Sequence, residues 1–257
     1  TVIGNYAYIA NWTQNPGGGI NIVDVSTPTV PQLVSTYGPF AGYVTGKGNT
    51  AAIIDLFSNC SILDISDPFN PVLSYIYPLP YYTIDVAVSG NYAYIGNNGF
   101  RVFDISDKTH PKQVGYTHED WELMAGAGAL IELAGDKAVY IRRSGMVNSP
   151  VVIMDISNPT TPTKLGKYNA PNMTQDLCIK GHYIFIACWW DGISVVDFQD
   201  PANPVMVSHT FEYHSAAVPG DEYCFGQALD VEGNYLYLID YGPFEDQDTR
   251  GLYIFDI

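Results

Sequence analysis

Short runs of apolar residues alternate with turn residues along the whole chain. The segment 86–105 is representative, because Val, Tyr, Ile and Phe occur there with a period of two, as in β-strands. Gly90 and Asn91 divide this segment and supply the positive φ that a tight hairpin needs. No helical periodicity of similar length competes with this pattern. The pattern therefore predicts several short strands joined by tight turns.

Two interleaved motifs define a repeat. One motif places a glycine before a hairpin strand, at Gly4, Gly48, Gly90, Gly135, Gly181 and Gly233. The other ends a strand with an aspartate, at Asp24, Asp64, Asp104, Asp155, Asp197 and Asp256. A four-stranded unit of this size cannot bury both of its faces, so copies must stack face to face. We predict an all-β protein: a single β-propeller domain over 1–257 with six four-stranded blades, the first and last incomplete, whose repeats begin near residues 1, 43, 85, 130, 176 and 228.

Prolines follow the repeated aspartates. Four copies carry Pro four and seven residues after the Asp, and the third copy has Lys108 at the first of these places. Proline has no N–H for a strand ladder, so it turns the chain out of the sheet, while the Asp side chain accepts hydrogen bonds from the turn. A carboxylate that occurs once per blade is therefore predicted to be structural.

The segment "GNYAYIGNNGFRVFDISD" and its sister segments resemble the LVIVD repeat family. The resemblance covers nearly the whole chain and lies in strands and turns. It implies a propeller fold, a secreted or cell-surface location, and a role in binding or scaffolding. It transfers no catalytic residues.

Composition narrows the range of partners. The chain has 27 acidic and 11 basic residues and a net charge of −16, which would repel nucleic acid and anionic membranes. No run of about 18 apolar residues occurs, so we expect no membrane-spanning helix. The four cysteines lack the spacing of a zinc site. We predict a disulfide between Cys188 and Cys224.

In a propeller, the connections from second to third strand and from fourth strand to the next first strand emerge on one face, around the central channel. We call them the upper connections, and they hold nearly everything that breaks the repeat. Their aromatic residues predict a surface for a carbohydrate or a protein: Trp12, Trp121, Trp189, Trp190, Tyr213, Tyr223 and Tyr241. The alternative is that these side chains pack against one another as small cores between loops.

Carboxylates and histidines in the same region suggest metal chemistry. Two upper connections contain His118, Glu119, Asp120, His209 and His214, which have the side chains to bind zinc. Asp240 with 245–248 offers oxygen ligands for calcium, or forms a solvated acidic tip. Asp85 and Asp176 lie five residues before a hairpin glycine, and Glu132 and Asp230 lie three before. These four either form a cation-binding acidic ring or bond N–H groups of the neighbouring blade.

The predicted function is recognition of a carbohydrate or protein by an extracellular or cell-surface propeller, with no catalytic residue and no certain cofactor. The sequence lacks a nucleophile elbow and a phosphate-binding loop. One alternative is a hydrolase or lyase that uses a divalent cation, Ca²⁺ or Zn²⁺, at the channel mouth. Another is a structural subunit of a surface layer or fibre, which self-associates through the open edge of the last blade.

Overall fold

The computed structural model covers residues 1–257. It describes residues 1–11, 19–38, 41–55, 59–79, 85–96, 99–118, 129–142, 149–171, 173–189, 192–210, 226–240 and 251–257. All residues outside these ranges belong to the upper connections. The hairpins at the opposite ends of the sheets are described throughout.

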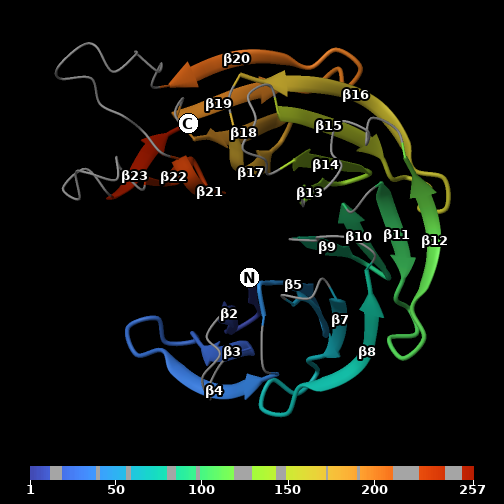
Figure 1. The fold of residues 1–257 in the computed structure, drawn as a ribbon. Coiled ribbons are helices and arrows are strands. Elements are labelled where there is room, and N and C mark those ends of the chain that lie inside the picture. The colour runs from blue at the N-terminus through green and yellow to red at the C-terminus, as the bar shows by residue number, and fades with distance from the viewer. Residues whose placement is uncertain are drawn as a thin grey trace. The chain divides into compact units, whose positions relative to one another are not determined.

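The first three blades are four-stranded antiparallel sheets whose strands lie in chain order (Figure 1). The first blade contains β1 (Val2–Ile3), β2 (Tyr6–Asn11), β3 (Gly19–Asp24) and β4 (Gln32–Tyr37). The second contains β5 (Tyr43–Lys47), β6 (Thr50–Ile54), β7 (Asn59–Asp64) and β8 (Val72–Pro78). The third contains β9 (Val86–Ser89), β10 (Tyr92–Gly96), β11 (Phe100–Asp104) and β12 (Lys112–Thr117).

The remaining blades follow the same order. The fourth contains β13 (Ala129–Ala134), β14 (Lys137–Arg142), β15 (Ser149–Asp155) and β16 (Thr163–Ala170). The fifth contains β17 (Thr174–Lys180), β18 (Tyr183–Cys188), β19 (Gly192–Asp197) and β20 (Val205–Thr210). The sixth has three strands among the described residues: β21 (Gly226–Glu232), β22 (Tyr235–Asp240) and β23 (Gly251–Asp256).

The fold class is the predicted one: an all-β, six-bladed β-propeller. The described residues contain only strands, turns and bends, so they include no helix that could cross a membrane. The predicted hairpin glycines adopt the left-handed conformation, with φ between 57° and 61° at Gly4, Gly48, Gly90, Gly135, Gly181 and Gly233. An L-residue with a Cβ is strained there, so these positions favour glycine and fix the hairpin register.

Contacts divide the chain into two compact units: Thr1–Ile131 with Asn158–Pro162, and Glu132–Ser157 with Thr163–Ile257. Each unit has apolar cores formed between successive sheets. In the first unit, Ile20 and Ile22 of β3 pack with Leu63 and Ile65 of the second blade. In the second unit, Ile193 of β19 packs with residues of β21 and β22. Side chains of this size stabilise a fold by about 1.5–3 kcal/mol each when fully buried.

The proline turns make a second contact between blades. Ser35 of β4 donates a hydrogen bond from Oγ to the carbonyl oxygen of Pro68, at 2.6 Å. At the equivalent place in β12, a Cβ on Gly115 would overlap the carbonyl oxygen of Pro159, and one on Gly166 of β16 would overlap that of Pro201. The strand position that receives a proline turn is therefore occupied by a small residue.

The contact between the second and third blades differs from the others on both sides, in the strand residue and in the turn. Tyr75 occupies the strand position, opposite Ile62 in the register. The turn carries Lys108 in place of the first proline, and its Nζ donates to the carbonyl oxygen of Asn49 at 2.7 Å and lies 3.3 Å from Asp64 Oδ2. A large strand residue thus occurs where the turn lacks its first proline.

Gly166→Ala tests the proline-turn contact. The added methyl group meets the Pro201 carbonyl, and this overpacking should lower the free energy of unfolding by about 1–3 kcal/mol. Gly251→Ala is the matched control, because among the described residues nothing lies within 4 Å of a Cβ at that strand position. Urea denaturation measures both variants. Equal stabilities would show that Gly166 is not crowded.

Candidate functional site

The repeated aspartates at the ends of the third strands close the following turns. Oδ1 of each accepts a hydrogen bond of 2.8–2.9 Å from the backbone N–H two residues later, at Asp24, Asp64, Asp104, Asp155 and Asp197. In the first four, hydrogen bonds from the following serine lower the pKa of the carboxyl group. The sequence prediction that these carboxylates are structural is confirmed for these five turns.

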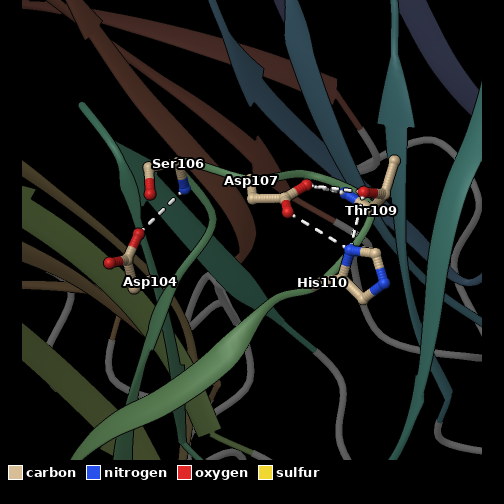
Figure 2. Close-up of polar contacts among 5 residues, drawn as sticks. All are labelled: Asp104, Ser106, Asp107, Thr109 and His110. Carbon is tan, nitrogen blue, oxygen red and sulfur yellow. Dashed lines mark hydrogen bonds and ion pairs between the residues drawn. The ribbon is translucent and has the colours of Figure 1, made fainter.

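The turn of the third blade places a threonine, a histidine and an aspartate in contact (Figure 2). Thr109 Oγ1 donates to Asp107 Oδ1 at 2.6 Å and lies 2.9 Å from His110 Nδ1, which is 3.2 Å from Asp107 Oδ2. These residue types resemble a catalytic triad. Equivalent turns indicate a structural role, however. At the position of His110 the second and fifth blades have asparagines, and Asn70 donates to Asp67 and Asn203 to Asp200 in the same way.

Asp85 and Asp176 connect the first strands of successive blades. Asp85 Oδ1 accepts from the N–H of Val86 at 2.7 Å, and Oδ2 accepts from the N–H of Ile131, at the start of the next blade, at 2.9 Å. Asp176 repeats the arrangement: Oδ1 accepts from Leu177 at 2.9 Å and Oδ2 from Leu229 at 2.9 Å. Of the two sequence interpretations, the hydrogen bond to the neighbouring blade is the one observed at both residues.

Acidic side chains gather on the first strands of the second unit. Glu132 of β13, Asp176 of β17 and Asp230 of β21 interact through their charges, and Asp230 also accepts the N–H of Val231 at 2.8 Å. Water reaches the Glu132 side chain, yet the surrounding protein desolvates its carboxyl group and, with the charges of Asp176 and Asp230, raises its pKa to about 7. Glu132 is thus a carboxyl group that takes up a proton near neutral pH.

The thiols of the described cysteines are buried. Burial raises the pKa of Cys60 to about 12, and burial with the charge of Asp230 raises that of Cys178. Cys188 is a wholly buried thiol whose Sγ donates to Ser194 Oγ at 3.5 Å. The predicted partner, Cys224, lies outside the described residues, so the disulfide between Cys188 and Cys224 stays a prediction.

Three residues predicted for the upper connections are described. Trp189 follows β18, is half-buried, and donates its backbone N–H to the carbonyl oxygen of Met173 at 2.8 Å. His118 follows β12 and is exposed, and His209 lies on β20 opposite Ser194. Outside the described residues lie Trp12, Trp121, Trp190, Tyr213, Tyr223, Tyr241, Glu119, Asp120 and His214. The geometry of the aromatic surface and of the zinc hypothesis thus stays a prediction.

The described residues contain no group of three or more His, Cys, Asp or Glu arranged to hold a metal ion. Asp240, from the calcium hypothesis, is the last residue of β22 and is buried, and its expected partners 245–248 lie outside the described residues. Asp85 and Asp176, two further candidates for metal binding, are described, and their carboxylates accept hydrogen bonds from backbone N–H groups.

A cavity of about 420 Å³ opens beside the hairpins of the fourth and fifth blades. Its lining includes Lys137, His182, Phe198 and Gln199. The His182 ring lies 4.2 Å from that of Tyr183, and Lys137 Nζ is 2.7 Å from Asp136 Oδ1. Sequence reasoning missed this cavity, because its walls come from hairpins of separate repeats.

The model of the family described as "LVIVD repeat" matches residues 1–39, 48–78, 82–117, 146–170 and 171–210, which is more than half of the chain. The chain belongs to the LVIVD repeat family. No curated protein sequence matches this LVIVD-repeat chain.

Solved structures share the fold of this LVIVD-repeat protein at low identity. A putative 6-phosphogluconolactonase from Bacteroides uniformis is 14% identical with a TM-score of 0.69, over 99% of this chain and 79% of that one. The computationally designed Ika8 protein is 12% identical with a TM-score of 0.61, over 98% and 67%. The N-terminal domain of Nup159 is 11% identical with a TM-score of 0.53, over 99% and 74%. At such identities the likeness concerns the fold alone.

Asp176→Asn tests the bond between the first strands of the fifth and sixth blades. The amide loses the charge that strengthens two hydrogen bonds, so the free energy of unfolding should fall by about 1–3 kcal/mol. The pKa of Glu132 should also fall, because the Asp176 charge raises it. Asp85→Asn is the control: it loses the same pair of bonds and should leave Glu132 unchanged. Carboxyl NMR titration with urea denaturation measures both effects; an unmoved Glu132 titration in Asp176→Asn would refute the coupling.

Glu132 should make stability depend on pH. Folding raises its pKa from 4.5 to about 7, so its stabilising contribution is full below pH 4.5 and is lost as the pH rises through 7. Glu132→Gln, which stays neutral, should therefore be more stable than the parent above about pH 7.5, by on the order of 1 kcal/mol given the solvent exposure of the side chain, and should gain nothing near pH 4. Thermal unfolding across this range provides the measurement. A gain that is constant with pH would contradict the assigned titration.

Proposed function

We propose that this LVIVD-repeat propeller is a non-catalytic binding protein of the cell surface or extracellular space. It recognises a carbohydrate or a protein through the aromatic residues of its upper connections. The observation that carries the proposal is the division between repeated residues, whose polar groups serve the fold, and the unrepeated residues of the upper connections.

The repeated chemistry supports a scaffold role. Five third-strand aspartates hold their own turns, and Asp85 and Asp176 hold the next blade. A carboxylate oxygen that already accepts a backbone N–H is not available to a substrate without a cost in stability, and in Asp85 and Asp176 both oxygens do so. These carboxylates therefore provide structure, and recognition falls to other residues.

The unrepeated residues have the chemistry of a binding surface. All four tryptophans of the chain occur in the upper connections. Tryptophan and tyrosine offer large flat faces with few rotatable bonds, which suits sugar rings and protein partners. Trp189 supports this placement, because a backbone hydrogen bond to Met173 fixes the start of its connection.

The charge of the chain restricts the partner. A net charge of −16 disfavours polyanions and favours neutral sugars or a basic protein surface. The surface or extracellular location follows the implication of the LVIVD resemblance, and high acidity supports solubility in such surroundings. Among neutral and basic partners, oligosaccharides are the simplest to test.

Tryptophan fluorescence, titrated with a panel of neutral oligosaccharides, tests the proposal. We expect saturable quenching by at least one sugar. Trp190→Ala should weaken it about tenfold or more, since loss of an aromatic hot-spot contact costs about 1.4 kcal/mol or more. Tyr183→Ala is the control, because this exposed tyrosine begins β18 at the hairpin end of the sheet. A chelator should leave the affinity unchanged.

The same titration distinguishes recognition from its main alternative, a metal-dependent enzyme. Binding or turnover that needs Zn²⁺ or Ca²⁺, and that disappears in His118→Ala, would replace the recognition proposal with a metal-dependent enzyme. A panel without any quenching, together with no retention of basic proteins on the immobilised chain, would overturn recognition through the upper connections.

A further inference from the structure

The cavity beside the hairpins of the fourth and fifth blades lies within the second compact unit, at the end of the sheets opposite the upper connections. Its volume of about 420 Å³ is in the range of sites that hold small molecules. Its walls come from the ends of β13 and β17, from the two hairpins, and from the turn that follows β19. Two successive blades thus share one concave surface, away from the recognition surface proposed above.

The polar residues of this lining differ from their counterparts in other blades. His182 follows a hairpin glycine, where four blades have an asparagine: Asn5, Asn49, Asn91 and Asn234. Lys137 lies two residues after a hairpin glycine, where four blades have a tyrosine: Tyr6, Tyr92, Tyr183 and Tyr235. Gln199 lies two residues after a third-strand aspartate, where the first four blades have a serine: Ser26, Ser66, Ser106 and Ser157. Three departures from the repeat therefore meet at one cavity.

The backbone that carries these residues is the one that the other blades have. The N–H of Phe198 donates to the carbonyl oxygen of His182 at 2.9 Å, and the five other blades make the equivalent bond at 2.8–3.0 Å. The N–H of Gln199 donates to Asp197 Oδ1 at 2.8 Å, as the four serines do to their aspartates at 2.8–2.9 Å. The hairpin and the turn thus form without a histidine or a glutamine, so the fold does not require these two side chains.

The charge of Lys137 is balanced at the cavity. Its Nζ lies 2.7 Å from Asp136 Oδ1, so the pair has no net charge. An anionic ligand would compete with Asp136 and would approach a chain whose net charge is −16. A cationic ligand would meet the ammonium group of Lys137. The cavity therefore favours an uncharged ligand.

The other lining residues provide both polar and apolar surface. The imidazole of His182 and the carboxamide of Gln199 each offer hydrogen-bond donors and acceptors. Leu133 and Ile179 are half-buried and Phe198 is buried, and these three make the apolar part of the walls. A neutral sugar ring has hydroxyl groups at its rim and C–H groups on its faces. Such a ring matches both kinds of surface.

We propose that this cavity is a second ligand site, which binds a neutral monosaccharide unit. Hydroxyl groups of the sugar bond the side chains of His182, Gln199 and Lys137, while its C–H groups contact the apolar walls. The residues that depart from the repeat select the ligand, and the repeated backbone holds them in place. This site is independent of the upper connections and of the recognition proposed for them.

Backbone amide NMR of the full chain tests the site with D-glucose, D-galactose, D-mannose and N-acetyl-D-glucosamine as probes. We expect saturable shifts at the amides of Gly181, His182 and Phe198 with at least one sugar. His182→Asn and Gln199→Ser restore residues of the repeat, so both should fold like the parent, and each should weaken binding about tenfold through a lost hydrogen bond. His110→Asn is the matched control. It makes the same exchange outside the cavity, at a turn where two blades have asparagine, and should leave the affinity unchanged.

Two further measurements define the site and the ligand class. Trp190→Ala should leave the shifts at the cavity amides unchanged, which distinguishes this site from the upper connections. D-glucuronate and D-galacturonate, the carboxylate counterparts of two of the sugars, should bind more weakly than the neutral sugars. Tighter binding of the carboxylates would overturn the proposal of an uncharged ligand. The site itself would be refuted by the absence of saturable shifts at the cavity amides with all four sugars, or by an affinity that His182→Asn and Gln199→Ser both leave unchanged.

Discussion

The structure depends on the inability of a single four-stranded sheet to bury its own apolar faces. Each blade must place its third-strand side chains against the next blade, as Ile20 and Ile22 do against Leu63 and Ile65. Two polar contacts give these apolar surfaces a fixed register. In one, the carbonyl oxygen of a turn proline packs against a small residue on the fourth strand of the preceding blade. In the other, an aspartate at the first strand of one blade accepts a hydrogen bond from a backbone N–H on the first strand of the next blade. Apolar burial supplies most of the stabilisation, while these contacts set the alignment.

This arrangement explains how polar groups divide between fold and function. Asp85 and Asp176 point both carboxylate oxygens at backbone N–H groups, so they are part of the scaffold although they sit among acidic neighbours. Glu132 has no equivalent bond to a neighbouring blade among the described contacts, and it takes up a proton near neutral pH to relieve desolvation and charge repulsion. The proline turns that make the contacts between blades lie at the ends of the sheets opposite the upper connections, so the recognition proposed for those connections need not alter them.

The repeat made much of the fold predictable. A glycine before each hairpin and an aspartate at each strand end are local signals, and both adopt the expected conformations, as at Gly90 and Asp104. Contacts between repeats could not be predicted as readily from the sequence. The sequence shows Gly166 as a small residue but cannot show that the carbonyl of Pro201 lies on it. The sequence likewise does not show that Cys188, the last side chain of β18, faces the core, because one step in register decides this.

The most direct test of this account is native-state hydrogen exchange of the full chain, read at the amides of Ile131 and Leu229. Both donate across a blade boundary to an aspartate, Asp85 and Asp176 respectively. If blades are stable only through their neighbours, these amides open with the core of their unit. The protection of Ile131 then matches that of Ile95 of β10, and the protection of Leu229 matches that of Ile186 of β18. Exchange at Ile131 or Leu229 that is orders of magnitude faster than at the central-strand amide of the same unit would show that the blades separate while each sheet stays folded, and would contradict the account.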